Sequence, residues 1–332
     1  MTRSLCLFLV LVATVFGASA AAQNASYRAP RTETGRPDLQ GVWNFNTGVP
    51  LQRPATAAGK KVFTKEEFEA RRATLRRALD TIGKIAPVEA IGLDWMDNRL
   101  HVEDMRTSLI TYPESGRLPE ALPGVRRMPQ IEDFIDVIAN IKGDSVPPAL
   151  GALFAAFTGG KKDSYTDFMP SERCLFDAMV PLVPQIDDNF VQIIQSPDHL
   201  VLITDFWRRV VALDGKPHVA DALRSWPGTS RGRWEGDTLV IETKNFNDRG
   251  PSLAGLGTPR DKVVTERLAR TSPNRIDYSA TVVDPKTFKD KVELSFPMAS
   301  VNAEIHEGGC HEGNYSMRNS LAAARLDDAK KK

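Results

Sequence analysis

The sequence lacks the short motifs that identify several large enzyme classes. It contains no Gly-x-Ser-x-Gly elbow, no glycine-rich phosphate loop, no dinucleotide fingerprint and no Cys-x-x-Cys pair. Charge of one sign is not in excess, with 43 basic and 42 acidic side chains, whereas nucleic acid and anionic membranes favour a basic surface. These absences exclude nucleotide-dependent enzymes and α/β-hydrolases. They also argue against nucleic acid as a partner, and no cofactor is predicted.

Long apolar runs are scarce as well, and the longest lies at the N-terminus. Arg3 precedes an apolar stretch over residues 5–16, which ends in small residues typical of a secretory cleavage site. A membrane helix needs about 20 apolar residues, so we expect cleavage, loss of Cys6 and no membrane insertion. Residues 1–22 are the expected signal peptide, and the mature protein is expected in the periplasm or outside the cell.

Removal of the signal peptide leaves two cysteines, Cys174 and Cys310. In an oxidising compartment two thiols most simply form a disulfide. A bridge that closes so long a loop contributes about 4–5 kcal/mol in the chain-entropy model. The alternative is a free, reactive Cys310 beside His311. We predict the bridge.

Short β-branched or aromatic runs bounded by turn residues dominate the second half of the chain. Sequential antiparallel strands in this number predict a mainly β fold, an antiparallel barrel of about eight strands. The interior of such a barrel fits side chains or one small ligand, and a β-sandwich is the competing architecture. The expected strands are residues 42–45, 190–195, 200–213, 231–234, 238–244, 262–270, 275–284 and 291–297.

The first half is mixed and rich in loops. Thr64 and Glu67 form a capping box that begins a helix running to about Leu79. Two further helices are expected over residues 131–141 and 148–157. The expected organisation is an extended leader over 23–37, a single barrel domain over 38–320 with a helical and loop-rich insertion over 60–168, and a flexible tail over 321–332.

Several motifs resemble those of known proteins. They are Gly41-Val42-Trp43, Arg224-Ser225-Trp226, the segment SRGRWEGDTLV over residues 230–240 and the segment CHEGNY over residues 310–315. The first, followed by an antiparallel meander, is similar to the opening of lipocalin-like (calycin) barrels. The others resemble a widespread group of exported bacterial proteins over most of the mature chain. The resemblance implies export and a calycin barrel, and it carries no reaction with it.

Residues 200–213 bring charge into an otherwise apolar strand. A buried charge needs a partner or a polar ligand, and this applies to Asp205, Arg208 and Arg209. The Asp205 carboxylate is also a candidate for proton transfer. Ligand contacts are predicted for Arg208, Arg209 and Trp207. The alternative is a structural ion pair, or a strand end outside the core. One continuous strand would present two faces: Leu200, Leu202, Thr204, Phe206 and Arg208 on one, and Val201, Ile203, Asp205, Trp207 and Arg209 on the other.

A second candidate lies in residues 304–312, which hold two of the five histidines. His306 and His311 are five positions apart with a Gly-Gly pair between them, so the zinc-protease motif is absent. No metal is favoured, and a site of His306, His311 and Glu312 is the weaker alternative. We predict that His311, assisted by Glu312, moves a proton with His306 or Asp205 as partner. Tyr315 is a further predicted ligand contact.

Residues 87–128 form a long irregular segment, and such segments often cover binding sites. His101 and Asp104 are therefore predicted to line the ligand cavity, with solvated loop charges as the alternative. The tryptophans fit core filling or, alternatively, a stacking platform for an aryl group or sugar. They are Trp43, Trp207, Trp226 and Trp234.

These candidate residues are compatible with two main functions, and a third function has less support in the sequence. One is an exported lyase, isomerase or hydrolase that acts on a small organic molecule through His311 and Glu312. Another is a non-catalytic barrel that carries an apolar, aromatic or sugar-like ligand. The third is an envelope interaction protein that docks through its first half. Convergence of titratable groups within one cavity separates the enzyme from the carrier.

Overall fold

The computed structural model describes residues 27–85, 104–125, 141, 162–168, 170, 173–175, 180–184 and 189–330. The expected signal peptide lies outside the described residues. So do His101, the helix expected over residues 148–157 and all but the last residue of the helix expected over 131–141.

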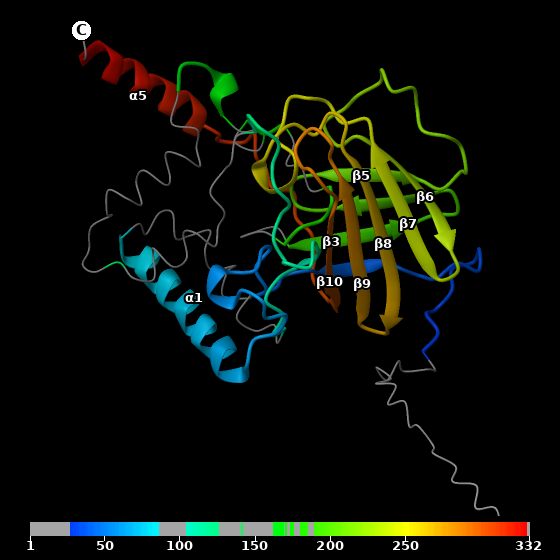
Figure 1. Cartoon of the computed structure of the whole chain (residues 1–332). Helices are drawn as coiled ribbons and strands as arrows, with labels where there is room; N and C mark the ends of the chain where they lie inside the picture. Colours follow the sequence, from blue (N-terminus) through cyan, green and yellow to red (C-terminus); the bar gives the residue numbers. More distant parts are fainter. Residues whose placement is uncertain are drawn as a thin grey trace, which may run out of the picture.

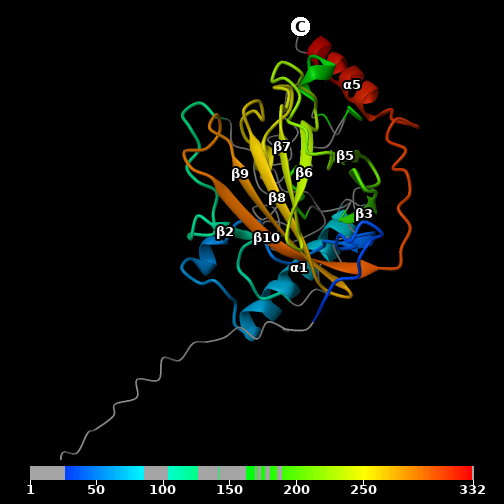
Figure 2. The same cartoon turned by 90° about the vertical axis from the view of Figure 1, so that its right-hand side faces the viewer.

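A single curved sheet forms the centre of the molecule (Figures 1 and 2). Its strands follow the order β1-β3-β4-β5-β6-β7-β8-β9-β10-β2, and β1 also pairs with β10. Closure through that pair gives a barrel of nine strands, with β2 added beside β10. The strands are β1 (Gly41–Asn44), β2 (Ile110–Tyr112), β3 (Phe190–Gln195), β4 (His199–Ile203), β5 (Arg208–Ala212), β6 (Thr229–Glu235), β7 (Thr238–Lys244), β8 (Val263–Ser272), β9 (Arg275–Val283) and β10 (Val292–Val301).

The closed barrel confirms the predicted architecture in its main feature and corrects it in two details. Val42 pairs with Val301 and closes the barrel, which excludes the sandwich. The strand count is nine rather than about eight. The barrel is also mixed, because β5 and β6 run parallel, with Val211 opposite Ser230. The chain between them must return to the end where β5 began, as a parallel pair requires.

The expected strand over residues 200–213 is two strands joined by a turn. The amide of Thr204 donates to the carbonyl of Trp207 at 3.0 Å and closes the β4–β5 hairpin. The turn also shifts the alternation. Inward positions are even in β4, as at Leu202, and odd in β5, as at Arg209 and Val211. The two faces predicted for one continuous strand are therefore wrong beyond Thr204.

Strand registers place several connections at one end of the barrel. The β4–β5 turn, the β7–β8 loop and the β9–β10 loop all lie there, because β4, β7 and β9 end where β5, β8 and β10 begin. We call this the loop end. The opposite end carries the β3–β4, β6–β7 and β8–β9 turns.

Both long helices lie outside the barrel in Figures 1 and 2. Helix α1 (Lys65–Ile85) begins at the predicted capping box, in which the amides of Thr64 and Glu67 donate to each other's side chains at 3.0 and 3.2 Å. Helix α5 (Ser316–Lys330) includes most of the expected flexible tail, which is thus helical. Its alanine-rich sequence has high helix propensity, and Arg325 donates to the carbonyl of Asp163.

The barrel is filled by side chains from both halves of the chain. The buried core includes Trp43, Phe45, Leu182 and Phe296, each no more than 2% exposed. Trp43 donates to the carbonyl of Leu39 at 2.9 Å. Core filling is therefore the role of this tryptophan. None of the helices in the described part of the chain is long and apolar enough to cross a membrane.

Candidate functional site

The interior of the barrel holds a buried ion pair. Arg209 on β5 donates to both carboxylate oxygens of Glu266 on β8, at 2.5 Å from Nη1 and 2.9 Å from Nη2. The side chains are 2% and 0% exposed. Burial lowers the pKa of the Arg209 guanidinium, but the Glu266 carboxylate outweighs it and holds the pKa above its ordinary value. The structural ion pair weighed as the alternative for residues 200–213 is present.

Hydrogen bonds extend this pair towards the segment over residues 180–184. The Tyr278 hydroxyl donates to Glu266 Oε1 at 2.8 Å and accepts from the amide of Leu182 at 2.9 Å. Burial, reinforced by the Glu266 charge, raises the pKa of Tyr278 well above its ordinary value. The Lys262 ammonium donates to the carbonyl of Val180 at 2.9 Å. Side chains of β9 and of the residue before β8 thus hold this segment in the barrel.

Lys262 is a second buried cation at the loop end. It is 2% exposed, and its Nζ lies 4.3 Å from the centroid of the Phe246 ring. Burial lowers the pKa of Lys262 to about 8, although Asp284 and Glu266 act in the opposite direction. Asp284 is 1% exposed. We call Trp207, Arg209, Lys262, Glu266, Tyr278 and Asp284 the loop-end cluster.

Several polar atoms of this region lack a hydrogen-bond partner within the described residues. Trp207 Nε1 and Arg209 Nε are unpartnered donors, and Asp284 Oδ2 and Thr287 Oγ1 are unpartnered acceptors. The Arg209 guanidinium carbon lies 6.0 Å from the centroid of the Trp207 ring, so the two donors belong to neighbouring side chains. A buried polar group without a partner costs about 1–3 kcal/mol. Bound water or a ligand would remove that cost.

The candidate site residues in and near β5 lie on different sides of the barrel wall. Arg209 and Trp207 point into the barrel, at 3% and 4% exposure. Arg208 is exposed on the outer face. Asp205 lies in the β4–β5 turn, where its carbonyl accepts from the amide of Gly308 at 2.8 Å. This last contact brings residues 304–312 beside the turn.

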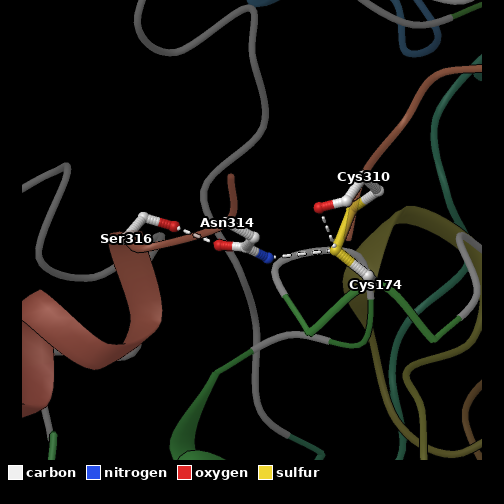
Figure 3. The surroundings of a disulfide bond; sticks show 4 residues. All are labelled: Cys174, Cys310, Asn314 and Ser316. Carbon is white, nitrogen blue, oxygen red and sulfur yellow. Dashed lines mark hydrogen bonds between the residues drawn. A yellow bond between two sulfur atoms is a disulfide. The ribbon is translucent and has the colours of Figure 1, made fainter. Parts of the chain in front are cut away.

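The predicted disulfide anchors the segment that contains the two candidate histidines. Cys174 and Cys310 are bonded, with their Cα atoms 5.7 Å apart, and the Asn314 amide donates to Cys174 Sγ at 3.0 Å (Figure 3). This bond confirms the predicted bridge and excludes a free Cys310. His306, His311 and their neighbours Glu312 and Tyr315 are exposed. The structure brings none of these four side chains into the loop-end cluster.

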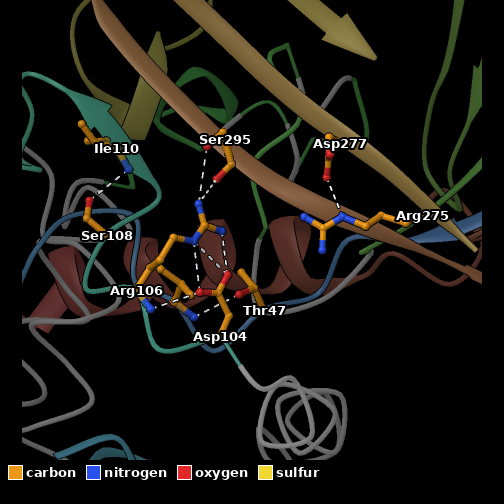
Figure 4. Close-up of polar contacts among 9 residues, drawn as sticks. Thr47, Asp104, Arg106, Ser108, Ile110, Arg275, Asp277 and Ser295 are labelled. Carbon is orange, nitrogen blue, oxygen red and sulfur yellow. Dashed lines mark hydrogen bonds and ion pairs between the residues drawn. The ribbon is translucent and has the colours of Figure 1, made fainter. Parts of the chain in front are cut away.

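Asp104 lies on the outside of the barrel wall. Its carboxylate accepts from Arg106, at 3.0 Å from Nε and 2.6 Å from Nη2 (Figure 4). Arg106 in turn donates to the carbonyl of Ser295 on β10 at 2.9 Å. Ser295 lies between the inward-facing Leu294 and Phe296 and therefore faces outward. This arrangement fastens the first half of the chain to β10.

The histidine side chains that the structure describes do not line the barrel interior. Within the described ranges, His218 alone has a mostly buried side chain, 10% exposed, compared with 46% at His199. Its Nε2 lies 3.2 Å from the Glu242 carboxylate, which is half exposed on the outward face of β7. Burial lowers the pKa of His218, and Glu242 partly opposes this shift. No group of three or more His, Cys, Asp or Glu side chains in the described chain could hold a metal ion.

Four members of the loop-end cluster are not among the residues predicted from the sequence. They are Lys262, Glu266, Tyr278 and Asp284. The alternation of β8 offers an indication for two of them, because Lys262 and Glu266 share their parity with the apolar Val264 and Leu268. A charge in an apolar strand, the signal that indicates Arg209, is therefore present at both positions.

Comparison with known proteins adds no assignment, since no family model, curated protein or solved structure matches the chain.

Proposed function

We propose that the protein is an exported β-barrel that binds a small, uncharged organic ligand at its loop end. The observation that carries this proposal is the pair of unpartnered donors on adjacent buried side chains, Trp207 Nε1 and Arg209 Nε. A carbonyl or ether oxygen of a ligand would satisfy both. Recognition by a few placed polar groups within apolar walls is typical of small-molecule sites.

Charge balance in the cluster favours a neutral ligand over an anion. Glu266 already neutralises Arg209 through two hydrogen bonds, and Asp284 lies near Lys262. An additional carboxylate would lose its hydration without gaining a free cation. A ligand that carries both a carbonyl and a donor group would suit the unpartnered donors and also the acceptors Asp284 Oδ2 and Thr287 Oγ1.

The same proposal includes export of the protein and its resemblance to a group of exported bacterial proteins. The N-terminal sequence has the features of a signal peptide, and the Cys174–Cys310 disulfide suits an oxidising compartment. The closed barrel is compatible with the lipocalin-like pattern. Exposure of His306 and His311 favours the carrier over acid/base chemistry at residues 304–312.

The test compares three probes of similar size: benzamide, benzoate and toluene. Isothermal titration calorimetry on the mature, disulfide-bonded protein should rank benzamide tightest, because only benzamide is neutral and carries a carbonyl and a donor. Trp207→Phe removes the indole donor and should weaken benzamide binding about tenfold, the equivalent of one net hydrogen bond.

Trp234→Phe provides the matched control, since Trp234 lies on β6 and is only partly buried against the core. It should leave the affinity for benzamide unchanged. Tighter binding of benzoate than benzamide, or equal affinities in the wild type and Trp207→Phe, would refute the proposed recognition.

A further inference from the structure

Lys262 and Asp284 occupy neighbouring inward positions at the loop end. Val263 pairs with Val283 and Val264 with Val282, so the next position of this ladder sets Lys262 opposite Asp284. Lys262 shares the inward parity of Val264, which is fully buried. Side chains at such directly opposite positions lie close together on one face of a sheet.

The ammonium group of Lys262 is poorly stabilised where it lies. It has one hydrogen-bond acceptor in the described structure, the carbonyl of Val180, and otherwise packs over the Phe246 ring. Burial lowers the pKa of this lysine to about 8. About 9% of it is then neutral at pH 7, against about 0.04% of an ordinary lysine with a pKa near 10.4. A neutral amine is a nucleophile, and burial is a recognised way to produce one.

Two oxygen atoms at the same end of the barrel have unused acceptor capacity. Asp284 and Thr287 belong to one turn, in which the Thr287 amide donates to the Asp284 carbonyl at 3.1 Å. Their Oδ2 and Oγ1 atoms are buried without a partner among the residues the structure describes. Gly257 backs this turn, since a Cβ there would lie 2.0 Å from Thr287 Oγ1. The β7–β8 loop thus packs directly on the turn and covers it.

We infer that Lys262 is a covalent site for a small hydroxyaldehyde, held as an imine beside Asp284 and Thr287. The amine lone pair adds to the carbonyl carbon, and a proton moves from nitrogen to oxygen to give a carbinolamine. Loss of the hydroxyl with a proton, as water, then forms the carbon–nitrogen double bond. No oxidant or reductant takes part. The ligand hydroxyl donates to Asp284 Oδ2 or Thr287 Oγ1.

The charges that face Lys262 set the pH range of this reaction. Asp284, at the end of β9, and Glu266, on β8, favour the protonated amine, whereas Arg209, on β5, disfavours it. Burial exceeds all three effects. Addition to the carbonyl should therefore increase with pH to a midpoint near 8, well below that of an exposed lysine.

The experiment is a competition among lysines of the wild-type, disulfide-bonded protein. Limiting glycolaldehyde with sodium cyanoborohydride at pH 7 traps each imine as a stable amine, and peptide mass spectrometry gives the rate at each lysine. Lys216, whose side chain is 74% exposed, is the reference. The larger neutral fraction of Lys262, partly offset by the weaker nucleophilicity of a less basic amine, predicts a rate about tenfold above that of Lys216.

Thr287→Val tests the binding contribution of Oγ1 at nearly constant volume. It should lower labelling at Lys262 several-fold and leave Lys216 unchanged. Slower labelling of Lys262 than of Lys216 in the wild type would overturn the inference, whatever the variant does. The outcome is independent of ligand recognition at Trp207, because benzamide has no aldehyde and glycolaldehyde has no aryl group.

Discussion

Glu266→Gln is the sharpest test of the buried network, because it changes charge while nearly preserving shape. In the native protein the Glu266 carboxylate accepts two hydrogen bonds from Arg209 and one from Tyr278. A glutamine at this position keeps one acceptor oxygen for these donors. It leaves the Arg209 cation, 2% exposed, without a counter-ion.

The magnitude follows from the burial of both partners. Removal of one member of a buried ion pair costs about 3–5 kcal/mol, since the remaining charge is desolvated and unpaired. The retained amide oxygen places Glu266→Gln near the lower limit, about 3 kcal/mol. The double variant Arg209→Met/Glu266→Gln removes both charges. It should therefore cost less than the sum of the two single variants, by about 2 kcal/mol or more.

Urea unfolding followed by near-ultraviolet circular dichroism, with the disulfide intact, measures these free energies. Glu235→Gln is the matched control, because the Glu235 carboxylate pairs with Arg233 and Arg267 at the surface and is 39% exposed. Exposed pairs contribute about 1 kcal/mol or less. A cost for Glu266→Gln no larger than that of Glu235→Gln, or additive single variants, would refute the reasoning.

Three further predictions use the same unfolding assay. The folded-state pKa of Lys262 is about 8 and the unfolded value is near 10.5, so the unfolded chain binds more protons between these values. Stability should therefore rise by about 2.5 kcal/mol from pH 7 to pH 10. Lys262→Met should remove most of this rise, and an unchanged pH slope would contradict it. The disulfide joins residues 136 positions apart; replacement of Cys174 and Cys310 by serine should cost about 3–5 kcal/mol, whereas no loss would show that the bridge does not constrain the unfolded chain. A Cβ on Gly308 would lie 2.2 Å from Cε1 of Phe206, so Gly308→Ala should cost about 1 kcal/mol. Adding Phe206→Ala should restore it, and failure of this rescue would rule out the clash as the cause.

The fold was largely readable from local patterns. Period-two alternation and turn residues located the strands β3, β7 and β9 to within a residue, and the Thr64–Glu67 capping box located the start of α1. The pattern failed at residues 200–213, because the turn contains no Gly or Pro between Thr204 and Trp207. Apolar residues on both sides of a short turn resemble one long strand.

The candidate site was readable only in part. Arg209 and Trp207 were selected from the sequence, because charge in an apolar strand requires a partner. Their partner Glu266 lies 57 residues further along the chain, and no local pattern connects the two. The two histidines of residues 304–312 indicated a site because histidine is rare in this chain. Their side chains are exposed, however, because the disulfide and the β4–β5 turn hold the segment at the surface.

The sequence by itself determined most of the barrel-forming strands, the helix start at Thr64 and the pairing of Cys174 with Cys310. Each of these depends on local periodicity or on a choice between very few partners. Closure of the sheet decided the rest. Pairing of β1 with β10 makes β5 and β8 face the same interior. In this apolar interior an unpaired charge is costly, so each buried charge is stable only beside an opposite charge or a hydrogen-bond partner. Arg209, Glu266, Tyr278 and Lys262 acquire their partners and shifted pKa values there, since burial and through-space contact exist only once the barrel is closed.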